Sequence, residues 1–179
     1  MTAALDWISN FLYAAILAGV PLLFGTLGEI LTEKAGNINL GVEGMMYMGA
    51  VFGFMGAYYL DSAIATLLFA FLGGLGGALV YAFLTVTLKA NQNVAGLTLT
   101  IFGTGLANLL GTNMINGSGS GAAMVSDAMK AFFRPMDMGA LTAIPYLGKL
   151  LFNHSLFTYL GIVLAIAAGW YLNHTAQGL

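Results

Sequence analysis

The sequence predicts an all-α membrane protein, a polytopic bundle of about five transmembrane helices. Of the 179 residues, 59% are hydrophobic and only 7% are charged, whereas about a quarter of the residues of a soluble domain are charged. A surface with so few charges is suited to lipid or to other apolar helices. The 25 glycines point the same way, because glycine is commoner in membrane helices and lets their backbones approach closely.

Charge and cysteine content argue against several other classes of function. The formal net charge of −2 gives no sign of a nucleic-acid partner. The absence of cysteine excludes disulfides and thiolate ligands. The two histidines lack ligand spacing, and no phosphate-binding glycine loop occurs. We therefore expect no metal site, no cofactor and no catalytic residue. A membrane-embedded enzyme would need paired acids, bases or metal ligands inside the apolar stretches, which contain almost none.

Five apolar stretches are long enough to cross a bilayer core, which needs about 20 helical residues. They cover residues 7–28, 44–60, 62–88, 94–112 and 156–172. Each is longer and more uniformly apolar than a barrel strand. Helices are then the expected way to satisfy backbone hydrogen bonds in lipid.

The first polar connection, residues 29–43, predicts a helix that stops and restarts. Gly36 suits the end of the first helix. Asn37 or Asn39 can cap the next one, and Glu43 would lie near its positive end. Two interpretations stay open. The segment is either an ordinary polar loop or a broken element that enters the bundle, where irregular backbone is tolerated only beside a cavity or pathway.

Two pairs of glycines predict close helix packing. Gly49 and Gly53 are four residues apart, as are Gly73 and Gly77. Such spacing gives a helix a smooth face that favours a close crossing. These faces serve either packing inside one bundle or a contact between subunits.

The fourth apolar stretch carries a row of polar side chains. Thr100, Thr104 and Asn108 are spaced by four residues and share one helical face. Hydroxyls and amides inside lipid need hydrogen-bonding partners. The row therefore predicts either hydrogen bonds between helices or the polar lining of a solute path.

The long connection 113–155 contains the signals of one short helix. Ser126 and Asp127 suit a helix start, and Pro135 stops the helix. In the segment between them Met129, Phe132 and Phe133 lie on one face, and the charged residues Asp127, Lys130 and Arg134 lie elsewhere. We expect a short amphipathic helix at the membrane surface.

Residues 23–50, LFGTLGEILTEKAGNINLGVEGMMYMGA, resemble the signature of bacterial ABC importer permeases. This is the binding-protein-dependent inner-membrane family that serves ribose, other simple sugars, nucleosides and branched-chain amino acids. The form NINLGVEG is closest to its nucleoside or simple-sugar branch. Residues 89–105, with NVAGLTLT, are similar to the next polar turn and helix of the family.

The resemblance implies the fold and partners of a type II importer permease in the cytoplasmic (inner) membrane. Its partners would be a second permease subunit, a cytoplasmic ABC ATPase that uses the ATP, and an extracellular solute-binding protein. The N-terminus and residues 113–155 would lie outside, and Lys34 and Lys89 inside. Solute would pass near residues 37–43 and the face that carries Thr100, Thr104 and Asn108.

Members of this family are usually longer than the present sequence. We therefore expect residues 1–179 to form a single but incomplete transmembrane permease domain, without the later helices and the ATPase-docking segment. An alternative is a small self-associating helical membrane protein without transport activity, which would use the glycine faces.

Overall fold

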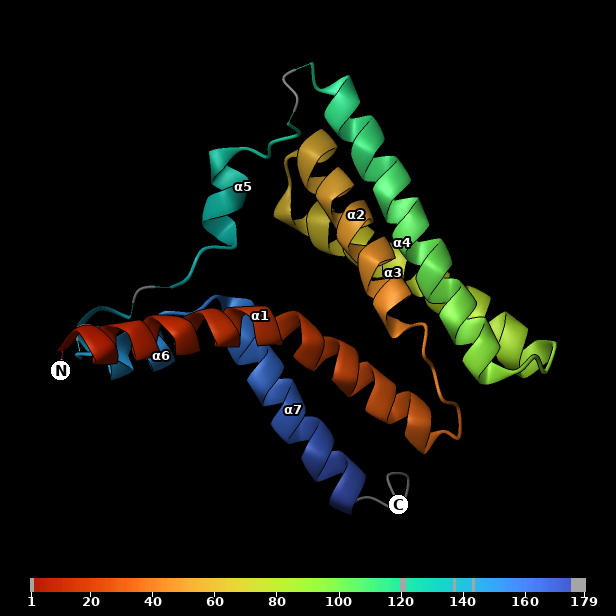
Figure 1. Ribbon diagram of the computed structural model, residues 1–179, viewed down its shortest axis with the longest axis horizontal. Coiled ribbons are helices and arrows are strands. Elements are labelled where there is room, and N and C mark those ends of the chain that lie inside the picture. Colours follow the sequence, from red (N-terminus) through yellow and green to blue (C-terminus); the bar gives the residue numbers. More distant parts are fainter. Residues whose placement is uncertain (1, 120–121, 137, 143, 175–179) are drawn as a thin grey trace. The chain divides into compact units, whose positions relative to one another are not determined.

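The computed structural model describes residues 2–119, 122–136, 138–142 and 144–174, and most of them are helical (Figure 1). The elements are α1 (Thr2–Lys34), α2 (Val42–Leu60), α3 (Ala63–Ala82), the π-helical η1 (Phe83–Thr87), α4 (Gln92–Gly117), α5 (Asp127–Phe132), the 3-10 helix η2 (Gly139–Leu141), α6 (Leu147–Phe152) and α7 (Leu156–His174). The described residues contain no strand. The predicted all-α class is confirmed.

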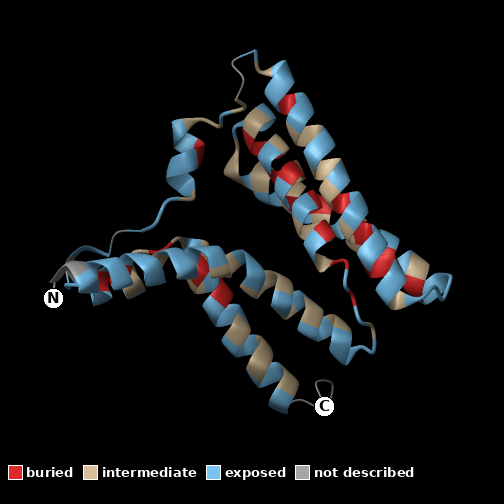
Figure 2. Ribbon diagram, viewed as in Figure 1, coloured by how far each residue is buried: buried red, intermediate tan, exposed pale blue. Residues whose placement is uncertain are grey.

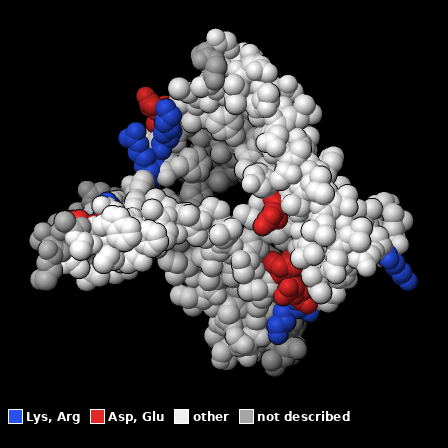
Figure 3. Space-filling model, viewed as in Figure 1, with Lys and Arg blue, Asp and Glu red and all other residues white. Residues whose placement is uncertain are grey.

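Four helices in the described part of the chain are long and apolar enough to cross a membrane. They are α1, α3 together with η1, α4, and α7, and they contain the predicted stretches 7–28, 94–112 and 156–172 and nearly all of 62–88. The fifth predicted stretch, 44–60, forms the 19-residue helix α2. Its mean hydropathy is lower because Glu43, four glycines and three tyrosines dilute its apolar residues. Figure 3 shows how few charges interrupt the visible surface.

The third connection is shorter and more helical than predicted. α4 continues past Thr112 to Gly117, so the connection begins at Ser118 and not at residue 113. It also contains η2 and α6, which have too few residues to give a periodic signal. The predicted amphipathic helix is α5, and its start is as expected: the Met129 N–H donates to Ser126 Oγ at 3.2 Å.

The chain divides into two compact units, which we describe separately. The first contains Met1–Ile30 and Phe133–Leu179. In it α1 packs against the C-terminal helices: the Tyr13 ring stacks on His154 with centroids 5.1 Å apart, and Phe24 lies beside Gly161 of α7. His154, which precedes α7, is only 2% exposed.

The second unit, Leu31–Phe132, is built around α2. α2 packs against both α3 and α4, and Figure 2 shows buried residues along these three helices, with exposed residues on their outer sides. Side-chain caps begin two of the helices. Ser62 Oγ accepts from the Ala65 N–H at the start of α3, and Asn91 Oδ1 accepts from the Val94 N–H at the start of α4.

The predicted packing glycines lie between α2 and α3 within this unit. A Cβ at Gly49 would come 3.1 Å from the Ala70 carbonyl oxygen, and one at Gly53 would meet Ala70 Cβ. From the other helix, Gly73 faces Met48 and Gly77 faces Met45. Residues of the same chain therefore cover the glycine faces of α2 and α3. The alternative of a self-associating protein would have required these faces to be exposed.

A second close crossing, between α2 and α4, was not predicted. A Cβ at Gly44 would overlap the backbone of Leu99 and Thr100, and one at Gly103 would overlap the backbone of Gly44. A Cβ at Gly96 would likewise meet the backbone of Leu40 and Gly41, just before α2. Gly96 and Gly103 are seven residues apart, about two helical turns, so they lie on one face of α4. This heptad spacing was the available sequence signal.

Candidate functional site

Residues 35–41, which we name the polar connector, join α1 to α2 without regular secondary structure. The connector begins where α1 ends, at Gly36, whose φ of +85° favours glycine. The Gly36 N–H donates to the Glu33 carbonyl at 2.9 Å, and the Asn37 N–H donates to the Thr32 carbonyl at 3.1 Å. These bonds close the last turn of α1, as the sequence predicted for Gly36.

Side chains from α3 and α4 satisfy the backbone of the polar connector. The Ile38 N–H donates to Gln92 Oε1 at 2.9 Å, and Tyr81 Oη donates to the Ile38 carbonyl at 2.6 Å. Thr100 Oγ1 donates to the Leu40 carbonyl at 2.9 Å. Non-helical backbone in a membrane protein needs such partners. The connector is thus folded onto the bundle and is not an ordinary surface loop.

A cavity of about 180 Å³ lies beside the polar connector. It is bordered by the end of α1, the connector, the start of α2 and the end of α3 with η1. Its lining residues are Thr32, Asn37, Asn39, Met45, Ala78, Tyr81, Ala82, Thr85 and Val86. The polar groups of this lining are amides and hydroxyls. The lining contains no charged side chain, and Met45, Ala78, Ala82 and Val86 form its apolar part.

The end of α3 widens into a π-helix beside this cavity. In η1 the Thr85 hydroxyl donates to the Tyr81 carbonyl at 2.9 Å, and Thr85 is only 8% exposed. Short π-helical turns inside longer helices are frequent at functional sites. The turn to α4 follows directly, with Lys89 at a φ of +52°.

Two of the predicted path residues line the cavity, but neither caps α2. Asn37 and Asn39 are both in the lining, and Asn39 is 7% exposed. The predicted cap is wrong, because the N-cap of α2 is Gly41, without a side-chain cap bond. Instead Asn39 Oδ1 accepts from the Gly41 N–H at 2.9 Å, which tightens the turn before the helix. Glu43 is exposed in the first turn of α2.

The polar row of α4 does not line the cavity as a group. Thr100 bonds to the connector, as described above. Thr104 Oγ1 donates to the Thr100 carbonyl of its own helix at 2.8 Å. Asn108 is exposed. The structure brings only Thr100 to the connector.

Sequence reasoning missed Gln92 and Tyr81, which hold the polar connector. Gln92 lies in a polar turn. Nothing in the residues around it indicates that its side chain bonds to a distant segment of the chain. Tyr81 lies near the end of an apolar stretch and is 5% exposed. A buried tyrosine hydroxyl needs a hydrogen-bonding partner. This general rule was the one indication in the sequence that Tyr81 bonds to another segment.

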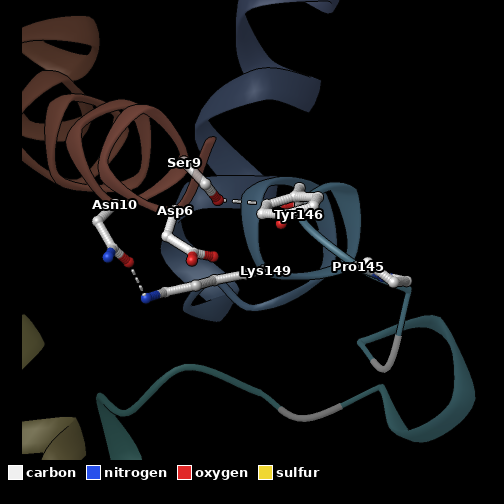
Figure 4. A pocket seen from close by; sticks show the side chains of 6 residues that line it. All are labelled: Asp6, Ser9, Asn10, Pro145, Tyr146 and Lys149. Carbon is white, nitrogen blue, oxygen red and sulfur yellow. Dashed lines mark hydrogen bonds between the residues drawn. The ribbon is translucent and has the colours of Figure 1, made fainter. Parts of the chain in front are cut away.

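A second cavity, of about 360 Å³, lies in the first unit between the start of α1 and α6. Figure 4 shows Lys149 pointing toward Asn10, with Nζ donating to Asn10 Oδ1 at 2.6 Å. Asp6, Ser9, Pro145 and Tyr146 complete the lining. Apart from Ser9 these residues are exposed, so the cavity is a surface feature. Among the residues described, no cluster of His, Asp and Glu could hold a metal ion.

Residues 11–179 match the protein family described as the permease component of branched-chain amino acid transport systems. The chain belongs to this permease family. The family consists of transporter components, so the permease is not an enzyme. Its family and its apolar helices make it a multi-pass membrane protein.

Three curated relatives are ABC transporter permeases. The permease is 32% identical over 172 residues to a putative glucose ABC transporter permease of Haloferax volcanii, covering 93% of this chain and 48% of the relative. It is 28% identical over 179 residues to a guanosine ABC transporter permease of Bacillus subtilis, covering 96% and 54%. It is 31% identical over 172 residues to a nucleoside ABC transporter permease of Lactococcus lactis, covering 92% and 52%.

The permease chain spans about half the length of these relatives. The predicted membership of the ABC permease family is confirmed. No solved structure matches the permease.

Proposed function

We propose that this permease chain is part of an ABC importer that moves a nucleoside or a simple sugar across the cytoplasmic membrane of a bacterium. A partner ATPase consumes the ATP, so the chain itself needs no cofactor. Residues 1–179 contribute one transmembrane permease domain to the complete protein. The observation that carries the proposal is the family match over residues 11–179.

The cavity beside the polar connector supports a neutral solute. Its polar lining consists of amides and hydroxyls, from residues such as Asn37, Asn39 and Thr85. Such groups hydrogen-bond the hydroxyls of sugars and the base edges of nucleosides without requiring a charge. The names of the three relatives, for glucose, guanosine and nucleosides, support the same class of solute.

The solute path we propose includes the polar connector and its surroundings. Asn37 and Asn39 contact the solute at the cavity, and Glu43 lies on the adjoining turn of α2. Thr100, Thr104 and Asn108 belong to the same path on α4. Alternating access, driven by the ATPase, exposes the path to one side of the membrane at a time.

The partners follow from this assignment. A second permease subunit completes the path, a cytoplasmic ABC ATPase supplies energy, and an extracellular solute-binding protein delivers the solute. The decisive experiment is co-purification of the full-length permease with the ATPase encoded beside it, followed by uptake of labelled guanosine and glucose in proteoliposomes. We expect a complex with ATP-dependent uptake. Failure to co-purify with any ATPase would overturn the proposal.

The cavity itself is tested by filling it. Ala78 is half-buried and lines the cavity, so Ala78→Leu should block part of the volume. Leu79, on the same helix, is 62% exposed, and Leu79→Phe is the matched control. We expect the first variant to lose uptake and the second to keep it. Equal uptake by the two variants would remove the cavity from the path.

The orientation of the chain has its own test, because the sequence contains no cysteine. We propose that Lys34 and Lys89 face the cytoplasm and that the connection from Ser118 to Ser155 lies outside. Single cysteines at position 34, 89 or 118 can be labelled in intact cells with a membrane-impermeant maleimide. Labelling at 118 alone is expected, and labelling at 34 or 89 would reverse the orientation.

A further inference from the structure

The two backbone groups of Ile38 are bound by side chains from two different helices. Gln92, the first residue of α4, accepts from the Ile38 N–H at 2.9 Å. Tyr81, near the end of α3, donates to the Ile38 carbonyl at 2.6 Å. The middle of the polar connector is therefore fixed from both sides. These bonds set the position of its neighbours Asn37 and Asn39 at the cavity.

The amide of Gln92 has only one possible orientation. A backbone N–H can only donate and a carbonyl can only accept. Gln92 Oε1 must therefore face the Ile38 N–H, and Gln92 Nε2 faces the Gly36 carbonyl at 3.4 Å. The same Nε2 donates to Asn37 Oδ1 at 3.0 Å.

The orientation of Gln92 in turn orients Asn37. Because Gln92 Nε2 is a donor, Asn37 presents its oxygen to Gln92. Its amino group is then the end that can reach a solute. Asn39 differs, since its Oδ1 accepts from the Gly41 N–H and its Nδ2 donates to Met45 Sδ at 3.7 Å. Asn37 is therefore the residue of the connector whose amide donor is directed to the cavity by Gln92.

We propose that Gln92 is a positioning residue that determines solute specificity, by fixing the Asn37 amide so that it presents an N–H donor to the cavity. The site then selects solutes that present an oxygen that can only accept, such as the ring oxygen of a sugar or the carbonyl of a nucleobase. This inference rests on the proposed solute path, and it assigns a role to a residue that does not line the cavity.

Two substitutions of similar size distinguish orienting the Asn37 amide from merely holding the connector in place. Gln92→Met removes every hydrogen bond of the side chain and should release the connector. Gln92→Glu keeps an acceptor for the Ile38 N–H. Its carboxylate cannot donate, so Asn37 must turn its amino group toward position 92 and its oxygen toward the cavity. In this variant the Ile38 N–H keeps its acceptor, the weaker contact with the Gly36 carbonyl is lost, and the group that Asn37 offers to the solute is reversed.

The experiment uses the complete transporter and two measurements. Hydrogen exchange of residues 35–42 reports protection of the Ile38 amide. Uptake of guanosine and of glucose gives KM and kcat. We expect Gln92→Met to lose the protection. We expect Gln92→Glu to keep it and yet raise KM about five- to tenfold with little change in kcat, since one hydrogen bond to the solute is lost.

Asn93→Asp is the matched control for Gln92→Glu. It adds the same charge at the next residue, which is exposed, and its KM should match that of the unchanged protein. A Gln92→Glu variant with unchanged KM would overturn the proposal, and so would an Ile38 amide still protected in Gln92→Met. If the unchanged transporter takes up neither solute, the proposed function fails, whereas the exchange measurement still decides whether Gln92 holds the connector.

Discussion

Gly44 of α2 and Gly103 of α4 are in backbone contact: a Cβ placed on Gly103 would overlap the carbonyl group of Gly44. A Cβ on Gly44 would in turn come 2.6 Å from Thr100 Cα. Thr100 is the residue that bonds to the Leu40 carbonyl. The crossing of the two helices therefore fixes the distance between α4 and the polar connector.

Gly103→Ala should destabilise the second unit. The added methyl group meets backbone, which cannot move aside, so we expect a loss of about 1–3 kcal/mol in the free energy of unfolding. Gly105→Ala is the control on the same helix, since nothing lies within 4 Å of its Cβ position. It should be neutral or slightly stabilising, because alanine is the better helix former. Unfolding in detergent measures both, and equal stabilities would contradict the close crossing.

Gly36 should tolerate asparagine better than alanine. Its φ of +85° is unfavourable for residues with a Cβ, although open space surrounds it. Gly36→Ala should cost about 1–2 kcal/mol, and Gly36→Asn should cost less because asparagine adopts left-handed conformations more readily. Gly28→Ala, inside α1 and also in open space, is the control. A Gly36→Ala protein as stable as the unchanged chain would show that α1 ends differently.

Tyr81 and Gln92 should be energetically coupled, although each bonds to a different atom of Ile38. Tyr81→Phe and Gln92→Met each leave one backbone group of Ile38 without its partner, at a cost of about 1–3 kcal/mol. Once either change has released the connector, the other has less to remove. The double variant should therefore lose less than the sum, by about 0.5–3 kcal/mol.

The control for this cycle is Tyr59→Phe, since Tyr59 is 63% exposed. Its effect should be small and should add to that of Gln92→Met. Denaturant unfolding of the purified protein in detergent gives the four free energies. Strict additivity of Tyr81→Phe and Gln92→Met would mean that the two side chains do not hold one common segment.

Ser126 should hold α5 in place. Its hydroxyl donates to the Asp61 carboxylate at the end of α2 and accepts from the Met129 N–H of α5. Ser126→Ala removes both bonds and should cost about 1 kcal/mol. Hydrogen exchange of residues 126–132 should then rise. Asp61→Asn keeps an acceptor for Ser126 and should leave exchange nearly unchanged, so equal exchange in the two variants would rule out the tether.

Hydrophobic length predicted the helices well, because it depends only on neighbouring residues. The start of α7 at Leu156 agrees with the prediction, and α2 is found at the predicted place. The end of α4 was misplaced because residues 113–117 are polar enough to resemble a loop, although they continue the helix. Composition identifies the segments that are apolar enough to lie in lipid, but it does not locate the last turn of a helix.

Sequence reasoning identified only part of the candidate site. The polar residues Asn37 and Asn39 stand out in an apolar chain, and both line the cavity. Their supports do not stand out, because Gln92 is 54 residues and Tyr81 is 43 residues from Ile38. A side chain that bonds to a distant backbone group leaves no pattern of spacing. The three-dimensional arrangement is needed to find it.

The helices that border the polar connector are longer than the hydrocarbon core of a bilayer is thick. α1 has 33 residues and α4 has 26, so at 1.5 Å per residue they measure about 50 Å and about 39 Å. A hydrocarbon core is about 30 Å thick. Both helices have polar residues at the end next to the connector, Glu33 on α1 and Gln92 on α4, and also near the opposite end, Asn10 on α1 and Asn116 on α4. Each helix therefore extends beyond the hydrocarbon core or crosses it with a strong tilt, and its polar ends are the parts suited to the headgroup region.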